Sequence, residues 1–356
     1  MIYISKLFLK DFMLFNSLNI DFSKNINIIS GENSTGKTAI LKLLYSVTKS
    51  ISEANKAKSE LTKEQNENLL VSKLQGVFRP DDDKIGRLVT RIQGRNRSDI
   101  VITVNSNSKL EFSFSTNKEK HVNIGQTLRR FVKAVEPIYF PPKEIISATE
   151  NFTSLYKEYH IAFEETYYDL ALLLDKPLKR GANTAKQNKI LESFNRIING
   201  NIIQRGKKFY LKVDGQGEFE MGLLSEGYRK LSTIIYLILS GSLNNNSILF
   251  WDEPETNMNP KMIEPIVQAL VVLATMGVQI FIATHDYFVQ QSFSMISEYK
   301  QLTLDNIDVK FICLYKEDDS IFFESGPTLL DLQHNAIMQE FDHLYDREQR
   351  LFYEDR

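Results

Sequence analysis

The chain has 356 residues, 42% hydrophobic and 25% charged, and its formal net charge is −2. This supports a sizeable core, as one large α/β domain with an insertion or as two domains, and excludes a global polybasic signal for nucleic acid or membrane. The single cysteine, Cys313, excludes an internal disulfide and fits a reducing compartment. Without a signal peptide or the roughly 20-residue apolar stretch of a bilayer span, we expect a cytoplasmic protein with no membrane partner.

The N-terminal region predicts strands that lead into a glycine-rich loop. Residues 2–9 alternate between apolar and polar side chains, and residues 12–15 and 18–22 continue as two further strand candidates. Residues 26–30 are a short β-branched run, and residues 39–44 are a good helix opening. The segment between them therefore lies where a strand passes into a helix.

This segment matches G-x-x-x-x-G-K-[ST], the nucleotide phosphate loop. Its two glycines allow backbone angles that a Cβ would forbid, so the N–H groups can point inward at an anion. We expect Lys37 to reach the β- and γ-phosphates of a bound nucleotide and the Thr38 hydroxyl to ligate Mg²⁺. An ordinary glycine-containing turn is the alternative. The residues expected to hold the nucleotide here are Gly31, Glu32, Asn33, Ser34, Thr35, Gly36, Lys37, Thr38 and Ala39.

The stretch after the loop has weaker patterns. Residues 39–75 predict mostly helix without sustained heptads, and residues 76–99 predict a charged surface connection. Residues 100–104 and 110–114 predict a hairpin, and residues 124–135 predict a helix.

The patterns remain mixed as far as residue 221. Residues 137–140 predict a strand that two prolines stop. Residues 150–175 predict one helix whose aromatic side chains pack in the core, and residues 186–198 predict another helix. Residues 209–213 and 218–221 predict a second hairpin.

From residue 222 the pattern alternates between helix and buried strand. Residues 228–240 and 261–275 predict helices, and residues 248–251 and 278–283 predict buried strands. This alternation indicates a parallel sheet covered on both faces. Residues 329–356 predict a charged amphipathic helix and tail, whose apolar side chains we expect to dock on the domain rather than on a partner.

Three further groups have types and positions suited to nucleotide-phosphate chemistry. Asp252 and Glu253 follow a buried parallel strand, where Asp252 could hold Mg²⁺ and Glu253 could polarise the attacking water; an acidic turn is the alternative. Ser225 and Gly227 at a helix start could bind an anion, with a plain N-cap serine as the alternative. His285 ends the next strand and could contact the γ-phosphate and the water, although a lone histidine is usually structural.

In this order, the motifs resemble those of the ABC-type ATPases, and more closely the RecF/SMC/OLD-like (AAA-15/AAA-21-like) branch. The phosphate loop is similar to Walker A, residues 224–227 to the signature motif and residues 248–253 to Walker B. Residues 255–260 are similar to the D-loop, and residues 284–286 to the switch histidine. The chain also resembles the Septu- and retron-associated, PtuA-like ATPases of antiphage defence.

The resemblance implies an α/β fold: a P-loop NTPase of the ABC-ATPase head type, with a mixed and mainly parallel sheet and an antiparallel β subdomain. It also implies a helical insertion lobe without a long coiled coil. The expected parts are an ATPase core at 1–50 and 219–328, an insertion at 51–218, and a C-terminal helix and tail at 329–356.

It further implies ATP hydrolysis by a homodimer or higher oligomer, with Glu253, His285 and Lys37 as catalytic residues. Ser225 and Gly227 of one protomer would then complete the site around the ATP of the other. The chain departs from the family pattern in two places. Residue 226 is Glu where the signature has Gly, and no clear Q-loop glutamine is present: Gln126 is an unfavoured candidate, and Lys143 or Glu144 could substitute.

Two functions fit these features. The first is an ATP-driven switch that controls a separately encoded nuclease or toxin in antiphage defence, because no fused effector is recognisable. The second is a RecF-like repair or replication ATPase that binds DNA directly, for which the basic residues at 87–97 and 176–189 could line a groove. A transporter subunit is disfavoured by the missing Q-loop.

Overall fold

A six-stranded sheet lies at the centre of the computed structural model, which describes residues 2–105, 108–118, 120–125, 128, 135–159, 161–179, 185–299 and 307–354. Its strand order is β14-β13-β3-β12-β11-β7, and all pairs are parallel except β13 with β14. The fold class predicted from the sequence is confirmed. The strands are β3 (Ile26–Gly31), β7 (Glu136–Phe140), β11 (Ser247–Asp252), β12 (Gln279–Ala283), β13 (Val309–Glu317) and β14 (Ser320–Gly326).

Successive residues of the central strands enter two separate cores. Ile29 and Phe250 belong to one cluster of buried side chains, while their neighbours Ile28 and Leu249 belong to the other. Side chains along a strand alternate between faces, so both faces of this sheet are covered. Continuous burial along β3, β11 and β12 follows from this arrangement.

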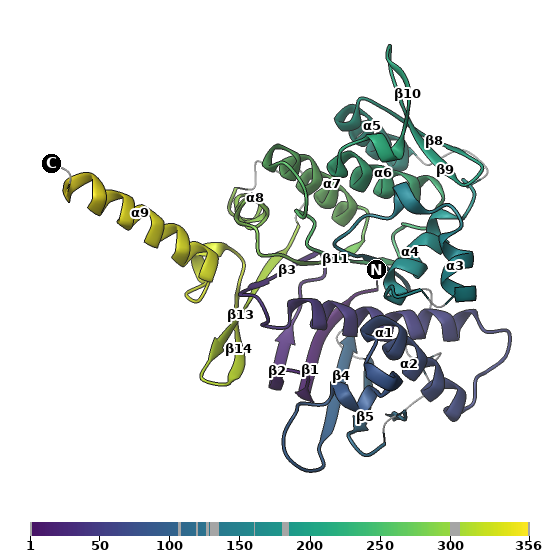
Figure 1. The fold of residues 1–356 in the computed structure, drawn as a ribbon, viewed down its shortest axis with the longest axis vertical. Coiled ribbons are helices and arrows are strands. Elements are labelled where there is room, and N and C mark those ends of the chain that lie inside the picture. Colours follow the sequence, from purple (N-terminus) through teal and green to yellow (C-terminus); the bar gives the residue numbers. More distant parts are fainter. Residues whose placement is uncertain are drawn as a thin grey trace.

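One face of the central sheet packs against α1, which is sandwiched between it and an antiparallel sheet (Figure 1). That second sheet has the order β2-β1-β4-β5-β6. The elements of this layer are β1 (Ile4–Phe12), β2 (Phe15–Asp21), α1 (Lys37–Lys56), α2 (Lys63–Phe78), β4 (Arg97–Val104), β5 (Ser108–Ser115) and β6 (Asn123–Ile124), with 3₁₀ turns at Asp81–Asp83 and Ile85–Leu88.

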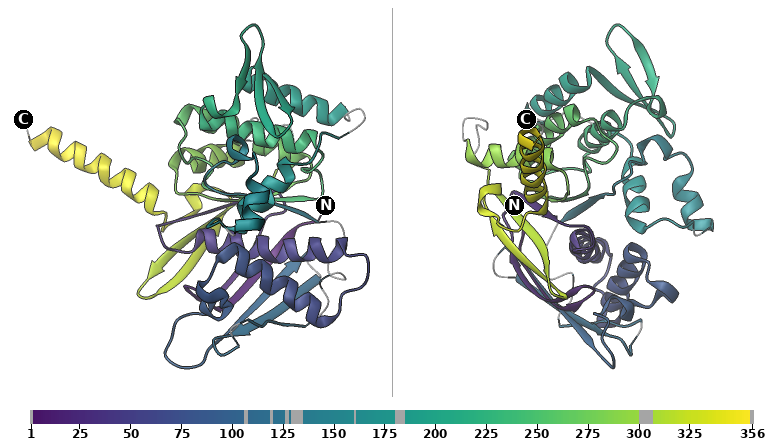
Figure 2. Two further views of the ribbon diagram at one scale, coloured as in Figure 1. Left: turned by 45° about the vertical axis from the view of Figure 1, so that its right-hand side comes forward. Right: turned by 60° about the vertical axis from the view of Figure 1, so that its left-hand side comes forward.

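The other face carries a helical layer and a small three-stranded sheet of order β10-β9-β8 (Figure 2). Its elements are α3 (Phe152–Tyr159), α4 (Glu165–Leu174), α5 (Ala185–Ile198), β8 (Gly200–Arg205), β9 (Lys208–Val213), β10 (Gly217–Glu220), α6 (Glu226–Leu239), α7 (Ile263–Thr275) and α8 (Tyr287–Glu298). Further 3₁₀ turns lie at Ile146–Ala148, Met221–Leu223, Pro260–Met262 and Leu329–Asp331. In the described part of the chain, none of the helices combines the length and apolar character that a bilayer crossing requires.

The single helix predicted for residues 150–175 is wrong, because the chain turns between α3 and α4. The rings of Phe152 and Phe163 have their centroids 5.4 Å apart. In one continuous helix their backbones would be separated by roughly 16 Å. The tertiary contact between these rings therefore requires the turn, which helical spacing alone does not reveal.

The expected division into a core and an insertion does not follow the sheets. Residue 50 lies inside α1, and β4 of the expected insertion pairs with β1. β7, from the same insertion, pairs with β11 in the central sheet. The strand β8 was not predicted, and most of the helix predicted for residues 124–135 lies outside the described residues.

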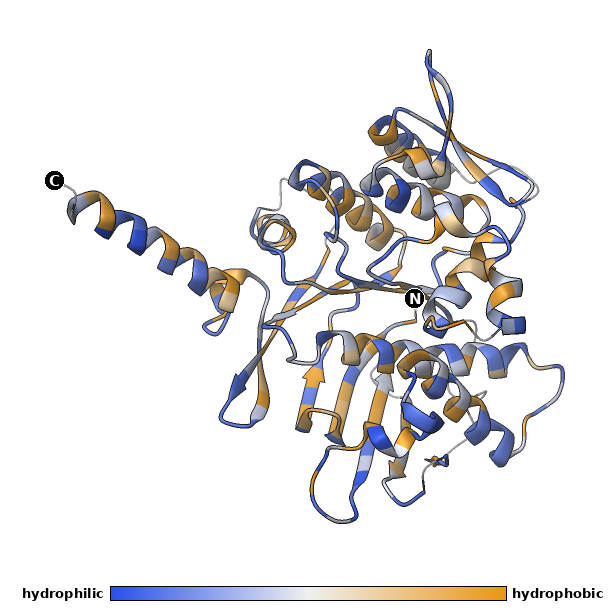
Figure 3. Cartoon of the chain, viewed as in Figure 1, coloured by the Kyte–Doolittle hydropathy of each residue, from blue (hydrophilic) through white to orange (hydrophobic). Residues whose placement is uncertain are grey.

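The expectation that the C-terminal helix docks on the domain is wrong for most of its length. α9 (Ala336–Glu354) projects from the body, with apolar and polar residues alternating along it (Figure 3). Leu344, Tyr345 and Leu351 are 54%, 62% and 54% exposed. Only near its start does α9 meet the body, where the ring of Phe341 lies 4.4 Å from that of Tyr287 among the described residues. The apolar pattern identifies one side of a helix but not its direction away from the preceding strand.

Candidate functional site

The loop from Gly31 to Thr38 joins β3 to α1, and both of its glycines are required by their surroundings. Gly31 has φ +137° and Gly36 has φ +94°, which L side chains rarely adopt. A Cβ on Gly31 would lie 2.2 Å from the carbonyl oxygen of Leu314, and one on Gly36 would lie 2.4 Å from the ring of Phe15. The loop is thus held closely between β13 and β2.

The Lys37 ammonium group lies inside the curve of this loop. Its Nζ donates to the carbonyl oxygens of Gly31 at 2.7 Å and Glu32 at 2.8 Å. Burial lowers the pKa of Lys37, and the nearby carboxylates of Glu253 and Asp252 oppose that shift. The lysine is therefore a buried cation with two acidic neighbours, in the position where a phosphate loop needs one.

Two hydroxyl groups meet one carboxylate near this lysine. The Thr38 hydroxyl donates to Oδ1 of Asp252 at 3.0 Å, and the Tyr139 hydroxyl donates to Oδ2 at 3.1 Å. Burial raises the pKa of Asp252 to about 6, while both hydrogen bonds oppose the rise. Mg²⁺ prefers such hard oxygen ligands, usually one or two carboxylates completed by phosphate and water, so the donor set fits this ion. The described residues contain no group of three acidic, histidine or cysteine side chains that would form a fuller protein cage.

Glu253 sits in a backbone conformation that favours a functional role. Its φ is +48°, uncommon for a residue with a side chain, and its N–H donates to the carbonyl of Ala283 at 2.9 Å. The Thr256 hydroxyl donates to Oε2 of Glu253 at 3.1 Å, and Nδ1 of His285 lies 3.3 Å from Oε1. The structure therefore brings Glu253 and His285 together at the ends of two adjacent strands.

Glu255 fixes the segment that carries His285. Its Oε1 accepts from the Thr284 hydroxyl at 2.7 Å and from the His285 backbone N–H at 3.2 Å. Nδ1 of His285 lies 3.7 Å from the same oxygen. Burial raises the pKa of Glu255. The histidine is thus held through its backbone, while its half-exposed ring lies beside the carboxylates of Glu253 and Glu255.

Ser225 and Gly227 lie at the start of α6 and do not line the cavity beside the phosphate loop. Ser225 occupies the N-cap position and is exposed, yet its side chain makes no capping hydrogen bond. Gly227 is buried, and a Cβ there would lie 3.2 Å from Met262. Ser225 is thus an N-cap residue by position but not by side-chain hydrogen bonding, and the N–H groups of the first turn keep their capacity to bind an anion.

The cavity beside the loop has a volume of about 350 Å³ and brings residues of four segments together. It is lined by Thr38, Lys42, Pro142, Ala162, Phe163, Glu164, Tyr167, Asp252 and Glu253. Sequence reasoning missed Tyr139, Glu164 and Lys42. Lys42 could have been found from the sequence, because it follows Thr38 by one helical turn. Glu164 could not, because its place depends on the turn between α3 and α4. Lys42 and Glu164 form an ion pair.

The suggested replacement of the Q-loop glutamine by Glu144 is not borne out by its contacts. Its carboxylate lies 3.2 Å from Arg229 of α6 and accepts from the Ser147 hydroxyl at 2.6 Å. Neither Lys143 nor Glu144 lines the cavity. Gln126 lies outside the described residues.

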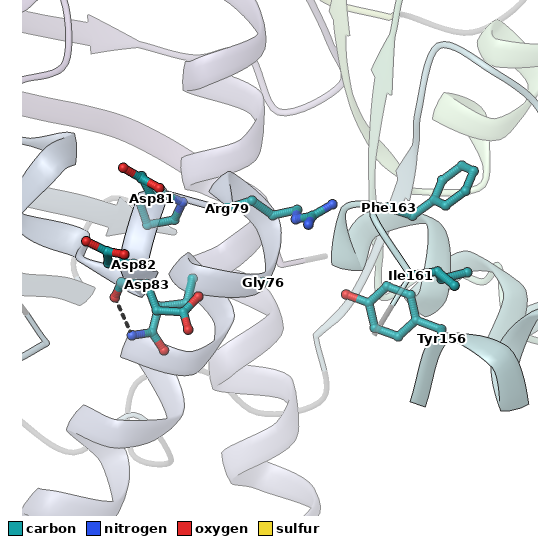
Figure 4. Close-up of a pocket in the computed structure, with 10 residues that line it drawn as sticks. Gly76, Arg79, Asp81, Asp82, Asp83, Tyr156, Ile161 and Phe163 are labelled. Carbon is teal, nitrogen blue, oxygen red and sulfur yellow. Dashed lines mark hydrogen bonds between the residues drawn. The ribbon is translucent and has the colours of Figure 1, made fainter. Parts of the chain in front are cut away.

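A larger cavity of about 700 Å³ adjoins the first one and shares Phe163 with it. Figure 4 shows Arg79, at the end of α2, reaching toward the segment that carries Phe163 and Tyr156. Burial raises the pKa of Tyr156 to about 12. The opposite wall holds the acidic residues Asp81, Asp82 and Asp83.

The sequence matches a family described as "AAA domain, putative AbiEii toxin, Type IV TA system" over residues 26–289, which include every candidate site residue. The DNA replication and repair protein RecF of Bacillus cytotoxicus is 26% identical over 143 residues, covering 40% of this chain and 32% of that protein. The RecF of Oenococcus oeni is 44% identical over 43 residues, 12% of each chain. The chain thus matches about a third or less of the length of these relatives.

Two solved Smc head domains are similar in fold. One, from Pyrococcus yayanosii with a coiled coil and joint, has a TM-score of 0.57 at 10% identity. The other, from Pyrococcus furiosus, carries an extended coiled coil and is bound to the C-terminal domain of ScpA; its TM-score is 0.54 at 12% identity. Each comparison covers 97% of this chain and 100% of the other. At these identities the likeness shows the fold alone.

Proposed function

The chain belongs to this AAA domain family and is an ABC-type ATPase of the RecF/SMC branch; on that premise, we propose that it binds ATP with Mg²⁺, hydrolyses it and uses the cycle as a dimer switch. The observation that supports the proposal best is the hydrogen bond between Thr38 and Asp252, at 3.0 Å. It joins the phosphate loop to the acidic strand end, although 214 positions separate the two residues in the sequence. Glu253 and Lys37 lie beside the same point.

Each residue then has a distinct role. Lys37 exchanges the carbonyls of Gly31 and Glu32 for the β- and γ-phosphates, to which its charge is better matched. Thr38 and Asp252 would hold Mg²⁺, which would supply positive charge to neutralise the phosphates. Glu253 orients and polarises the attacking water, and His285 contacts the γ-phosphate.

The other half of the site comes from a second copy of the chain. Ser225 is exposed, and the first turn of α6 offers N–H groups to an anion. Buried Lys230 fixes this helix against the segment after Glu253, since its Nζ donates to the carbonyls of Pro254 at 3.0 Å and Thr256 at 2.8 Å. The same segment thus contacts both the water-polarising residue and the helix that serves the partner, which suits a switch driven by the γ-phosphate.

The output of this switch is the control of a separate effector, a nuclease or toxin, in antiphage defence. The family description refers to a putative toxin of a toxin–antitoxin system and names neither a separate effector nor phage defence, so this output rests on the sequence resemblance alone. The alternative is direct DNA binding, which the RecF relatives favour. Two of the basic residues expected to line a DNA groove are neutralised locally: Arg87 lies 2.8 Å from Asp81, and Arg97 lies 2.7 Å from Asp99. Arg180 of the other stretch lies outside the described residues.

The test is Glu253→Gln, measured by sedimentation and by ATP turnover. We expect the variant to keep ATP binding, to form an ATP-dependent dimer more stably than the wild type, and to lose about 100-fold or more of the turnover, as removal of a general base does. Glu264→Gln, on α7, is the matched control and should leave dimer formation and ATP turnover unchanged. Unchanged turnover in Glu253→Gln would reject the assigned base, and ATP-dependent DNA binding by the trapped dimer at low salt would favour the alternative output.

A further inference from the structure

Tyr139 contacts the strand end that carries Asp252, the carboxylate proposed above to hold Mg²⁺. It belongs to β7, at the edge of the central sheet, and its side chain is 2% exposed. Its hydroxyl donates to Oδ2 of Asp252 at 3.1 Å, while the Thr38 hydroxyl takes Oδ1. Each oxygen of this carboxylate is thus held by a different hydroxyl group.

The register of the sheet places the Tyr139 hydroxyl there. Tyr139 lies opposite Phe250 in the parallel pairing of β7 with β11. Asp252 follows Phe250 by two residues, so all three side chains share one face of the sheet. A tyrosine side chain is long enough to reach Asp252 from a register position two residues earlier, where a phenylalanine side chain would stop short of the carboxylate.

A second buried tyrosine holds the ring in place. Tyr45 of α1 packs against Tyr139, with 5.3 Å between the ring centroids. The Tyr45 hydroxyl donates to Asp169 of α4 at 2.6 Å, and Asp169 pairs with Lys73 of α2 at 3.2 Å. The two tyrosines are equally buried and each donates to a buried carboxylate, but only Tyr139 reaches the candidate metal site.

We propose that Tyr139 is the positioning residue of the magnesium site: its hydroxyl fixes Oδ2 of Asp252 so that Oδ1, on the Thr38 side, is presented to the ion. This rests on the proposed function. Hydrogen-bond partners of metal ligands orient the ligand and keep it charged, and their loss typically weakens metal binding by about 10- to 100-fold. If the Tyr139 hydroxyl were purely structural, its removal would lower stability without changing the Mg²⁺ requirement, because a buried hydroxyl needs only a hydrogen-bond acceptor.

The test compares Tyr139→Phe with Tyr45→Phe, two substitutions that each remove one buried hydroxyl from a carboxylate. ATP binding is measured by calorimetry across Mg²⁺ concentrations and with Mg²⁺ chelated, and stability by thermal unfolding. We expect Tyr139→Phe to raise the Mg²⁺ concentration for half-maximal enhancement of ATP binding about 10-fold or more, with Mg²⁺-free ATP binding within twofold of the wild type. Tyr45→Phe should leave the Mg²⁺ requirement within twofold.

An unchanged Mg²⁺ requirement in Tyr139→Phe, or an equal shift in Tyr45→Phe, would overturn the inference. The Asp252→Asn background tests it again if Tyr139→Phe alone does not fold. In that background the tyrosine has no carboxylate to position, so Tyr139→Phe should change the Mg²⁺ requirement by less than a further twofold. A further 10-fold rise in the Mg²⁺ requirement would overturn the inference. A wild-type chain whose ATP binding ignores Mg²⁺ would instead overturn the proposed function itself.

Discussion

The phosphate-loop region and the start of α6 are built in opposite ways. In the first, Lys37, Thr38 and Asp252 are held by hydrogen bonds within the chain. In the second, Ser225 is exposed without a capping bond. Donors that a chain leaves open at a helix start are available to a ligand, whereas those already bonded have their geometry fixed in advance. Under the proposed function, the first region would bind the nucleotide within one chain and the second would complete the site of a second copy.

The largest expected effect comes from a substitution in the phosphate loop. Lys37→Ala should weaken ATP binding about 1,000-fold or more, because two charge-assisted hydrogen bonds to phosphate are lost. Calorimetry measures the affinity. Lys49→Ala, on the same helix and paired with Asp169 at 3.4 Å, is the control and should bind ATP like the wild type. Equal losses in both variants would mean that α1 is merely destabilised.

A smaller effect is expected at the start of α6. Ser225→Arg should leave ATP binding by each chain intact but lower turnover about 100-fold, the usual scale for losing one preorganised donor to a developing charge. Mixing it with Lys37→Ala should restore part of the activity, since one intact loop then meets one intact α6. If the mixture stays inactive while each variant remains folded, the two regions do not act across a dimer.

The smallest effect concerns Asp252 alone. Its pKa is about 6 against an ordinary 3.8, so the folded chain binds this proton more tightly than the unfolded chain and loses stability as the pH rises between these values. Asp252→Asn should therefore be more stable than the wild type at pH 7, by roughly 1–3 kcal/mol, and this advantage should vanish near pH 4. Urea unfolding without nucleotide at both pH values measures it. A wild type that is the more stable at pH 7 would contradict the prediction.

Much of the candidate site was predictable because its residues lie in local patterns. The glycines of the loop and the carboxylates after β11 occupy positions that the backbone of a strand end or turn requires, and the structure brings Thr38 and Asp252 into contact. Glu144 was not correctly predicted, because its partner Arg229 belongs to a helix far away in the sequence. The turn between α3 and α4 was missed for a similar reason, since the contact of Phe152 with Phe163 defines it.

By itself the sequence determined the phosphate loop, the acidic strand end and the parallel sheet, because each is specified by short-range backbone preference and the alternation of buried side chains. Tertiary structure alone decided that β7 lies beside β11. As a result, the Tyr139 hydroxyl reaches Asp252. It also decided that α9 leaves the body with its apolar side exposed. Pairing partners and helix directions depend on contacts between distant residues, which no local pattern encodes.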